Sequence, residues 1–351
     1  MYIIKAMIMA AGVGNRLMPL TAEIPKPMVP MANRPLMEHI VALLTRHGFN
    51  NIISNLYYHA DNIYNYFLDG GKYGANMLYS REEELMGTAG GVKKCAWFLD
   101  DTFVIVSGDA LTDVNLTRLV DEHKKRGALA TIALKEVEEV EQFGVVITDE
   151  YGRIQSFQEK PNQEEALSNK ANTGIYVFEP EIFKHIPEQE FYDFGKQVFP
   201  HLVKIGAPFY GINIDNNYWC DVGSTDTYHQ SHADILEGKV NVSPKGKLVT
   251  TDNGRVLLGE GVSIGDNVRF EGNCVIGPGC MIGNGAVIAD SVIWNENIIR
   301  ENAILRECII GSNCHIGCSA EIKTGAVIAS GCRLDDHVKV PAASKVFNSA
   351  D

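Results

Sequence analysis

The chain has 351 residues, of which 45% are hydrophobic and 21% are charged, and its formal net charge at pH 7 is −13. This length predicts two domains, the composition is that of an ordinary globular protein, and the negative charge argues against a nucleic-acid partner. No apolar run is long enough to span a membrane and no signal peptide opens the chain. We therefore expect a cytoplasmic protein whose eight cysteines do not form a disulfide framework.

The first predicted strand ends in a glycine turn. The apolar run Tyr2–Met9 leads into MAAGVGNRLMPLTAEIPKPM, residues 9–28, and such a turn after a strand is typical of a phosphate cradle. A dinucleotide fingerprint would need a third glycine where Leu17 stands, and an ATPase-type P-loop would need Gly-Lys-Ser/Thr. What remains is Arg16 and Lys26, the latter between two prolines that restrict its backbone. This pattern favours a small anionic substrate; the alternative is a solvated loop with a chance arginine and lysine.

Apolar runs and helical periodicities alternate through residues 1–225. Helices are predicted over Pro35–His47 and Asn115–Arg126, where the apolar residues fall on one face. Strands are predicted over Ile3–Met9, Asn51–Leu56, Phe103–Val106, Ala130–Leu134, Gly144–Ile147 and Gly174–Phe178. The alternation predicts an α/β fold with a mostly parallel, doubly wound, Rossmann-like sheet and helices on both faces. Such sheets bind ligands at the carboxyl ends of their strands, where the glycine turn and the sequence SGD at 107–109 both lie.

From about residue 250 a six-residue period replaces this pattern. Each unit is led by an aliphatic or aromatic residue, at positions 258, 264, 270, 276, 282, 288 and 294. We expect the phase then to slip by two near residue 297, at a corner loop or bulge, and to continue at 298, 304, 310, 316, 322, 328, 334 and 340. A hexad repeat of this kind predicts a parallel β-helix of about five coils with three hexads in each.

The repeat also accounts for most of the cysteines. The fifth place of a hexad holds Cys274, Cys280, Cys308, Cys314 and Cys332, and small apolar residues occupy the same place elsewhere. We therefore predict a small, inward-facing position, where buried cysteine acts as a small hydrophobe. The alternative, a metal site made of Cys314, His315 and Cys318, lacks a second close pair of ligands.

The motifs of residues 1–230 resemble those of the sugar-1-phosphate nucleotidyltransferases. The family signature Ala-Gly-x-Gly-Thr-Arg-Leu-x-Pro-Leu-Thr, followed by Pro-Lys-Pro, reads here as AGVGNRLMPLT at 11–21 and PKP at 25–27, with Asn15 in place of Thr. Further matching segments are LMGTAGG at 85–91 (with Met86 added), SGD at 107–109, FGVV at 143–146, EKP at 159–161, NTGIY at 172–176 and WCDVGSTDTY at 219–228, where Ser224 replaces Thr. The guanylyltransferases that use mannose 1-phosphate look most similar.

The resemblance implies a fold and a reaction. A left-handed β-helix tail is common in the family, so we expect a catalytic domain over residues 1–240 and the β-helix over 250–345. The implied reaction is attack by the phosphate oxygen of a sugar 1-phosphate on the α-phosphorus of a nucleoside triphosphate, with pyrophosphate leaving. The nucleophile is already an anion, so the protein has to position two polyanions and neutralise charge. Oligomers are expected as well, since β-helix tails often assemble.

The same resemblance assigns roles to the phosphate and metal residues. The backbone N–H groups of Ala11, Gly12 and Gly14 would bind the triphosphate, and Ala10 would belong to the same nucleotide site. Arg16 would bind the β- and γ-phosphates of the leaving pyrophosphate, and Lys26 would stabilise charge on the α-phosphate. Asp109 and Asp221 would hold Mg²⁺ together with phosphate oxygens. Asp109 has a structural alternative, which is to cap the next helix.

The remaining assignments concern the sugar and the base. Sugar-phosphate contacts are implied for Gly144, Glu159, Lys160, Asn172 and Thr173. The base pocket would include Glu82, Gly87 and Thr88. A carboxylate at residue 82 only accepts hydrogen bonds, and guanine offers it two adjacent donors, so we expect GTP with mannose 1-phosphate. Glucose 1-phosphate with UTP or dTTP is the runner-up, and three glutamates at 82–84 that simply face solvent are the structural alternative.

Two rival functions belong to other classes. One is a non-catalytic regulatory paralogue, which would be supported by the loss of Arg16, Lys26, Asp109 or Asp221, all of which are present. The other is a β-helix acyltransferase, which would need a catalytic histidine near an extended loop, whereas His315 and His337 lie in uninterrupted hexads.

Overall fold

The computed structural model describes residues 4–348, which divide into two compact units. Unit 1 comprises residues 4–13 and 40–221, and unit 2 comprises residues 14–39 and 222–348. The sequence-order domains 1–240 and 250–345 stay a prediction. Among the described residues, no helix combines the length and the apolar character that a membrane span requires.

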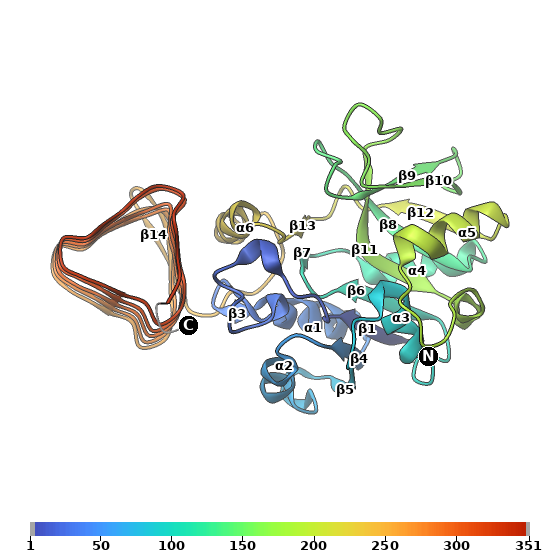
Figure 1. Ribbon diagram of the computed structural model, residues 1–351, viewed down its shortest axis with the longest axis horizontal. Helices are drawn as coiled ribbons and strands as arrows, with labels where there is room; N and C mark the ends of the chain where they lie inside the picture. Colours follow the sequence, from blue (N-terminus) through green and yellow to red (C-terminus); the bar gives the residue numbers. More distant parts are fainter. Residues whose placement is uncertain (1–3, 349–351) are drawn as a thin grey trace. The chain divides into compact units, whose positions relative to one another are not determined.

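Unit 1 is built on a nine-stranded sheet (Figure 1). The strand order is β10-β9-β11-β6-β1-β4-β5, and β8 pairs with both β11 and β12. The strands are β1 (Lys5–Met9), β4 (Asn51–Leu56), β5 (Asn76–Arg81), β6 (Phe103–Ser107), β8 (Ala130–Glu136), β9 (Gly144–Thr148), β10 (Ile154–Glu159), β11 (Lys170–Phe178) and β12 (Phe209–Asn213). β1 is parallel to β4 and β6, β4 is parallel to β5, and β11 is antiparallel to its neighbours. The predicted mostly parallel α/β fold is confirmed.

Local sequence explains where the helices begin and end. They are α1 (Leu36–Arg46), α2 (Ala60–Phe67), α3 (Gly87–Lys94), α4 (Leu116–Lys125) and α5 (Phe199–Lys204). The predicted segments around residues 36–46 and 116–125 are confirmed. The Asn115 side chain caps α4 by accepting a hydrogen bond from the Arg118 N–H at 3.0 Å. Its apolar face, which includes Leu119 and His123, is buried.

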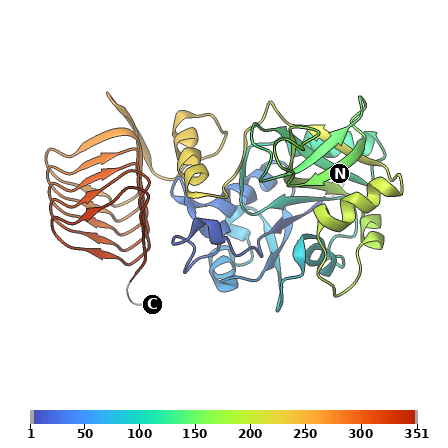
Figure 2. The ribbon, with the colours of Figure 1, turned by 45° about the horizontal axis from the view of Figure 1, so that its top comes forward.

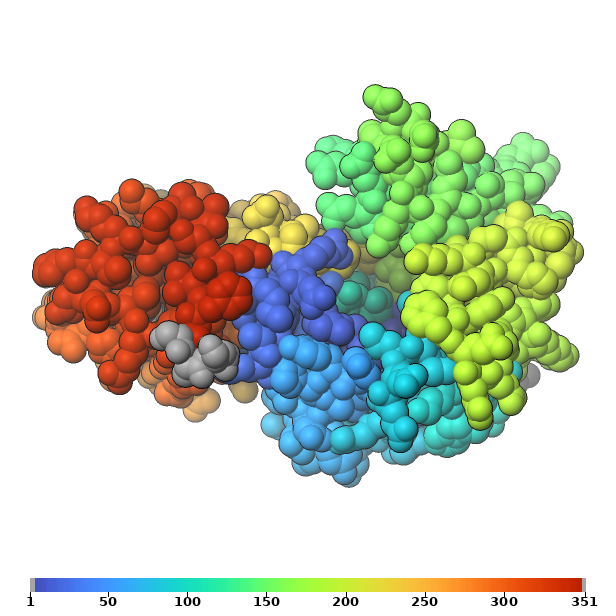
Figure 3. All heavy atoms as spheres, in the orientation of Figure 1, coloured from blue at the N-terminus to red at the C-terminus, as the bar shows by residue number. Residues whose placement is uncertain are grey.

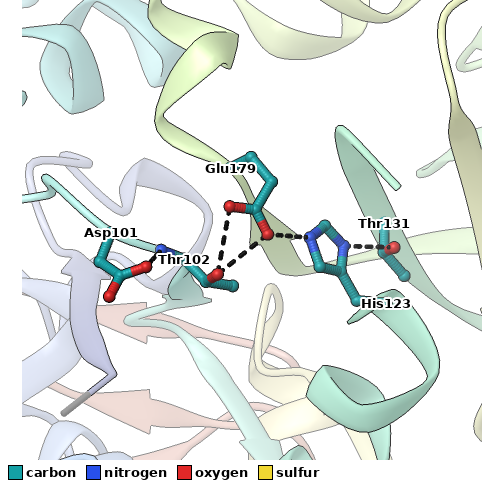
Figure 4. A network of polar contacts seen from close by, with 5 residues as sticks. All are labelled: Asp101, Thr102, His123, Thr131 and Glu179. Atoms are coloured by element: carbon teal, nitrogen blue, oxygen red, sulfur yellow. Dashed lines mark hydrogen bonds and ion pairs between the residues drawn. The ribbon is translucent and has the colours of Figure 1, made fainter. Parts of the chain in front are cut away.

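A buried polar network joins α4 to the edge of the sheet where β6 and β8 begin (Figure 4). His123 lies between Glu179 at 3.1 Å and the Thr131 hydroxyl at 2.8 Å, and Thr102 donates to the same carboxylate at 2.9 Å. Burial lowers the pKa of His123, so its neutral ring donates to Glu179 and accepts from Thr131. The network stabilises the beginning of β6, whereas Asp109 follows the other end of this strand.

The antiparallel part of the sheet forms a projection on unit 1. β9 and β10 pair with each other, and β9 also pairs with β11. Together with the segment between β10 and β11, they stand out from the rest of this unit, in green (Figure 3). Several predicted sugar-binding residues lie on these strands or next to them.

Unit 2 contains the signature segment from Gly14 onward, one long helix and the β-helix. The helix α6 (Thr225–Glu237) begins at Ser224, whose hydroxyl accepts from the Thr227 N–H at 3.1 Å. Thr227 accepts in turn from the Ser224 N–H at 2.9 Å, which completes a capping box. Serine caps a helix as well as threonine does, so Ser224 is a conservative departure from the family motif.

The predicted β-helix is confirmed. Viewed down its axis it has three sides (Figure 1), and its short strands stack in parallel from coil to coil (Figure 2). After the antiparallel pair β14 (Lys247–Thr251) and β15 (Gly254–Leu258), the strands are β16 (Ser263–Ile264), β17 (Arg269–Ile276), β18 (Met281–Ile282), β19 (Val287–Ala289), β20 (Val292–Ile293), β21 (Ile298–Ile299), β22 (Ile304–Arg306), β23 (Ile309–Ile310), β24 (His315–Ile316), β25 (Glu321–Ile322), β26 (Val327–Ile328), β27 (Arg333–Leu334), β28 (Lys339–Val340) and β29 (Lys345–Val346).

The predicted phase slip near residue 297 is wrong. On one side of the β-helix the stacked inward residues are Ile276, Ile293, Ile310 and Ile328, so two coils of 17 residues precede one of 18. The corners after positions 288 and 305 are each one residue shorter than the others, with Asp290 and Glu307 at φ 40° and 44°. Two separate shortenings therefore replace the single slip.

The shortenings change which residues face the core. Ile299 and Leu305 point inward, whereas the predicted leading residues Ile298 and Ile304 lie on the outer side and are half-buried. Trp294 also lies outside the coil, although its side chain is buried.

The predicted inward position of the hexad cysteines is confirmed. Cys274, Cys280, Cys308, Cys314 and Cys332 all belong to the buried core of the β-helix. The residues that follow Cys314 and Cys332, His315 and Arg333, are paired on adjacent strands, so the two cysteines occupy neighbouring coils. Burial raises the pKa of the Cys314 thiol to about 12.

Candidate active site

The two predicted metal ligands lie close together at the carboxyl edge of the sheet in unit 1. Asp109 follows β6, and Asp221 ends β13 (Trp219–Asp221), which pairs with β7 (Ala110–Thr112) so that Asp221 is opposite Ala110. The Ser107 hydroxyl donates to Asp109 at 2.5 Å. Because Asn115 caps α4, the alternative role of Asp109 as the cap of the next helix is wrong. Two neighbouring carboxylates, completed by phosphate oxygens, are a donor set that suits Mg²⁺.

Both carboxylates line a hollow of about 280 Å³. Among the residues that share this lining are all five predicted sugar-phosphate residues, which are Gly144, Glu159, Lys160, Asn172 and Thr173. Thr88 from the predicted base segment lines it too, whereas Glu82 does not. Residues from seven strands (β1, β6, β7, β9, β10, β11 and β13), from their loops and from α3 thus converge on one polar cavity.

Glu159 is an acid of this hollow whose pKa is shifted. Burial raises its pKa, and the nearby carboxylate of Asp193 raises it further. The side chain has room because a Cβ atom at Gly195 would lie 2.5 Å from its Oε2 atom, and one at Gly144 would lie 3.1 Å from it. The Glu159 side chain is nevertheless exposed at this hollow, so its carboxylate can accept hydrogen bonds from sugar hydroxyl groups.

The other sugar-side residues are held by neighbours within unit 1. The Thr173 hydroxyl donates to the Ala133 carbonyl at 2.7 Å, and the Thr173 carbonyl accepts from the Trp219 indole at 3.0 Å. The Trp219 ring also packs edge-on against Phe143, with 5.4 Å between centroids. Asn172 accepts from the Gly174 N–H at 3.1 Å. Thr173 therefore fixes the backbone here, since its hydroxyl is already engaged.

The predicted base segment is connected to the sugar side. The Thr88 hydroxyl donates to Asp193 at 2.9 Å and accepts from the Phe194 N–H at 2.9 Å. Gly87 has φ +73°, and a Cβ atom there would lie 2.5 Å from the Tyr192 carbonyl oxygen. Thr88 and Gly87 thus attach the start of α3 to the loop before residue 194.

Glu82 takes part in a buried chain of hydrogen bonds. One of its carboxylate oxygens accepts from Asn55 Nδ2 at 2.7 Å, and the other accepts from the Met86 N–H at 3.0 Å. Asn55 Oδ1 accepts in turn from the Ala10 N–H at 3.0 Å. Glu82 is only 7% exposed, so the alternative in which the three glutamates all face solvent is wrong for this residue. These hydrogen bonds connect the phosphate turn after β1 to the base segment.

The rest of the signature segment belongs to unit 2. Arg16 is exposed on the short helix Asn15–Leu17, and Lys26 begins the short helix Lys26–Met28 directly after Pro25. Lys26 is 6% exposed, and its stem packs against Gly14, where a Cβ atom would lie 2.8 Å from Lys26 Cβ. Gly14 has φ +72° and its carbonyl accepts from the Thr21 hydroxyl at 3.0 Å. In unit 1, Ala11 is buried and Gly12 is exposed, with nothing within 4 Å of an added Cβ.

Sequence reasoning missed several residues of the site. The hollow is also lined by Asp193, Ser107 and Trp219. Asn55 donates a hydrogen bond to the carboxylate of Glu82. Asn55 had a detectable signal, because it is a polar residue near the carboxyl end of a predicted parallel strand, where such sheets bind ligands. Asp193 had none, since it lies in a loop whose path only the fold defines.

Comparison with known families divides the chain in two. Residues 5–238 match the nucleotidyl transferase family, and residues 238–340 match the EIF2B subunit epsilon LbH domain, a left-handed β-helix. The chain is 46% identical over 250 residues to a UTP–glucose-1-phosphate uridylyltransferase of Synechocystis, which covers 67% of this chain and 64% of the relative. It is 33% identical over 237 residues to a mannose-1-phosphate guanylyltransferase of Mycobacterium tuberculosis, covering 67% of this chain and 65% of the relative. The matches thus span less than two thirds of the length of these relatives.

The fold is also similar to a solved structure. A putative glucose-1-phosphate thymidylyltransferase from Bacillus anthracis, in complex with a sucrose, aligns with a TM-score of 0.60. The alignment covers 68% of this chain and 97% of the chain in the solved structure, at 23% sequence identity, which shows a shared fold.

Proposed function

The chain belongs to the nucleotidyl transferase family, and we propose that it joins a nucleoside triphosphate to a sugar 1-phosphate. In this reaction the sugar phosphate oxygen forms a bond to the α-phosphorus, and the bond from the α-phosphorus to the β-bridging oxygen breaks, releasing pyrophosphate. The observation that carries the proposal is the pair of carboxylates formed by Asp109, in the turn before β7, and Asp221, at the end of the neighbouring strand β13, in the same hollow as Glu159. Bound Mg²⁺ would neutralise charge on the phosphates during the transfer.

The main residues of the site then have defined roles. Glu159 and Asn172 accept hydrogen bonds from the sugar hydroxyls, and Lys160 binds the sugar phosphate. Lys26 stabilises charge on the α-phosphate, and Arg16 binds the outgoing pyrophosphate. Backbone N–H groups of Ala11, Gly12 and Gly14 bind the triphosphate, and Gly87 and Thr88 contribute to the base pocket.

For the nucleotide we propose UTP, with glucose 1-phosphate as its partner. The relative at 46% identity is a UTP–glucose-1-phosphate uridylyltransferase, and this supports the earlier runner-up over GTP. The case for guanine rested on Glu82, and both oxygens of that carboxylate already accept hydrogen bonds from Asn55 and Met86. GTP with mannose 1-phosphate is the second candidate, supported by the guanylyltransferase relative. A cytoplasmic homo-oligomer completes the proposal.

The test is a matrix of four nucleoside triphosphates against glucose 1-phosphate and mannose 1-phosphate, scored by pyrophosphate release with Mg²⁺. We expect UTP with glucose 1-phosphate to have the highest kcat/KM. A higher value for GTP with mannose 1-phosphate would contradict the choice of base and leave the transferase proposal standing. No release with any pair would refute it and favour a non-catalytic paralogue, and turnover of acetyl-CoA would indicate the acyltransferase.

A Glu82→Gln variant separates base recognition from positioning. An amide keeps one acceptor but places an NH₂ group against either the Asn55 amide or the Met86 N–H. If Glu82 positions the segment, turnover should fall by a similar factor with every triphosphate. A change in the ranking of the triphosphates would show instead that Glu82 reads the base.

A further inference from the structure

A tight hairpin in unit 2 begins two residues after the short helix Lys26–Met28. Its strands β2 (Pro30–Met31) and β3 (Arg34–Pro35) are joined by Ala32 and Asn33, with φ values of 50° and 64°. Two central residues with positive φ make a type I′ turn. Alanine is unfavourable in this conformation and persists there only when the surroundings fix it. We call residues 30–35 the clamped hairpin.

The chain around α6 binds the backbone of the clamped hairpin. The Tyr228 hydroxyl donates to the Pro30 carbonyl. The Ala32 N–H donates to His232 Nδ1 at 3.3 Å, and the Ala32 carbonyl accepts from the Lys245 N–H at 3.0 Å. Burial lowers the pKa of His232 to about 3, so its ring stays neutral and Nδ1 remains an acceptor.

The β-helix itself supplies two more contacts. Asn33 Nδ2 donates to the Ile276 carbonyl at 3.0 Å. The Trp294 indole donates to the Tyr228 hydroxyl oxygen at 2.9 Å. An indole N–H can only donate, so it occupies an acceptor site of the hydroxyl oxygen and leaves the hydroxyl proton for Pro30. Tyr228 and Trp294 are 0% and 3% exposed, so water does not compete for these bonds.

The clamped hairpin is continuous with the turn that carries Lys26. The Val29 N–H donates to the Lys26 carbonyl at 3.2 Å, and the Val29 carbonyl accepts from the Leu36 N–H at 3.0 Å. Val29 thus bonds on one side to the lysine turn and on the other side to the residue after the hairpin. A shift of the hairpin would be transmitted to Lys26 through this residue.

We propose that Trp294 and Asn33 are positioning residues, through which the β-helix fixes the placement of Lys26. The consequence for turnover rests on the nucleotidyl transfer proposed above, whereas the positioning itself does not. In this view the β-helix is a structural support of the phosphate-binding segment. Neither residue contacts a substrate, and each acts through the clamped hairpin.

The first experiment measures hydrogen exchange of the peptide covering residues 26–36 in the full-length protein. The variants are Trp294→Phe, which removes the indole N–H, and Asn33→Gly, which removes the contact with Ile276 and keeps a residue that tolerates positive φ. Each should speed exchange of this peptide roughly fivefold, the effect of one lost hydrogen bond. Ile328→Val, a fully buried change in the core of the β-helix, is the control and should leave this peptide unaffected. Unchanged exchange in Asn33→Gly and Trp294→Phe would overturn the proposal, whether or not the protein is a transferase.

The second experiment measures turnover at a temperature where all variants are folded. Trp294→Phe and Asn33→Gly should lower kcat several-fold with little change in the KM for the sugar phosphate. Tyr228→Phe should lower kcat as Trp294→Phe does. The double variant Trp294→Phe with Tyr228→Phe should have a kcat no lower than that of Tyr228→Phe alone, because Trp294 and Tyr228 both act through the hydrogen bond to Pro30. Additive losses in the double variant, or a loss of similar size in Ile328→Val, would refute the relay. An inactive wild type would refute the proposed function, and the exchange experiment would still decide the positioning.

Discussion

Replacing Gly14 by alanine should separate the cost of a strained backbone from the displacement of Lys26. Gly14 has φ +72°, where an alanine costs about 1–2 kcal/mol. The new Cβ would lie 2.8 Å from Lys26 Cβ, a contact that neither atom avoids by a rotation of its own side chain. The lysine stem must therefore move, and a displacement of about 1 Å at a reacting group can cost roughly a hundredfold in rate. We expect Gly14→Ala to lose about 1–2 kcal/mol of unfolding free energy and roughly a hundredfold in kcat.

The matched control is Gly48→Ala. Gly48 has φ +83° and nothing lies within 4 Å of an added Cβ, so it carries the same backbone cost without a close contact. Both variants are followed by urea unfolding and by pyrophosphate release at saturating substrates. Gly48→Ala should lose a similar unfolding free energy and keep the wild-type kcat. If kcat of Gly14→Ala lies within twofold of that of Gly48→Ala, the reasoning about Lys26 is refuted.

Three further predictions address the metal ligands, a buried histidine and the β-helix. Asp109→Asn and Asp221→Asn should each lower kcat by orders of magnitude with the unfolding free energy preserved, and a near wild-type rate at saturating Mg²⁺ would exclude that residue as a ligand. Because burial lowers the pKa of His123, the unfolded chain binds a proton at this residue more readily than the folded chain does. The free energy of unfolding should therefore fall as the pH drops below about 6.5, by up to about 1.4 kcal/mol per pH unit for this group. His123→Gln should remove that part of the slope in urea titrations at pH 7 and pH 5, and an unchanged slope would contradict it. Cys314 and Cys332 should resist a thiol reagent in the native protein and react after unfolding, whereas rapid native labelling would contradict their burial.

The helices and strands that could be predicted from the sequence are those with strong local patterns. α4 has a capping asparagine, an apolar face and a glycine after its last turn, and β6 is a short apolar run, so both were predictable. α3 was not, because GTAGGVKK is rich in glycine, the poorest helix former after proline. Its first turn is held instead by the Tyr192 carbonyl, which accepts from the Ala89 and Gly90 N–H groups at 2.9 and 3.0 Å. Such a tertiary contact leaves no local signal.

The phase of the β-helix shows a second limit. Residues 298–299, 304–305 and 309–310 are all pairs of aliphatic residues, so either member of a pair could face the core. The choice depends on the number of residues in each corner, which is set by backbone angles such as the φ of 40° at Asp290. Hydrophobic periodicity specifies the repeat but does not resolve a one-residue difference in a corner.

The glycines of the site motifs show why residue identity was easier to predict than residue role. A glycine-rich turn after a strand suggests backbone donors for phosphate, and sequence reasoning interpreted Gly14 and its neighbours in this way. In the structure, glycines also lie beside the charged side chains of the motifs, where a Cβ atom would collide with them. A Cβ at Gly14 would meet Lys26 at 2.8 Å, one at Gly91 would meet Glu82 at 2.7 Å, and one at Gly144 would meet Glu159 at 3.1 Å. These glycines create space for the buried side chains of Lys26 and Glu82 and for the carboxylate of Glu159, each of which lies nine or more residues away in the sequence. A motif therefore reports that a glycine is needed, and only the fold reveals which charged group needs it.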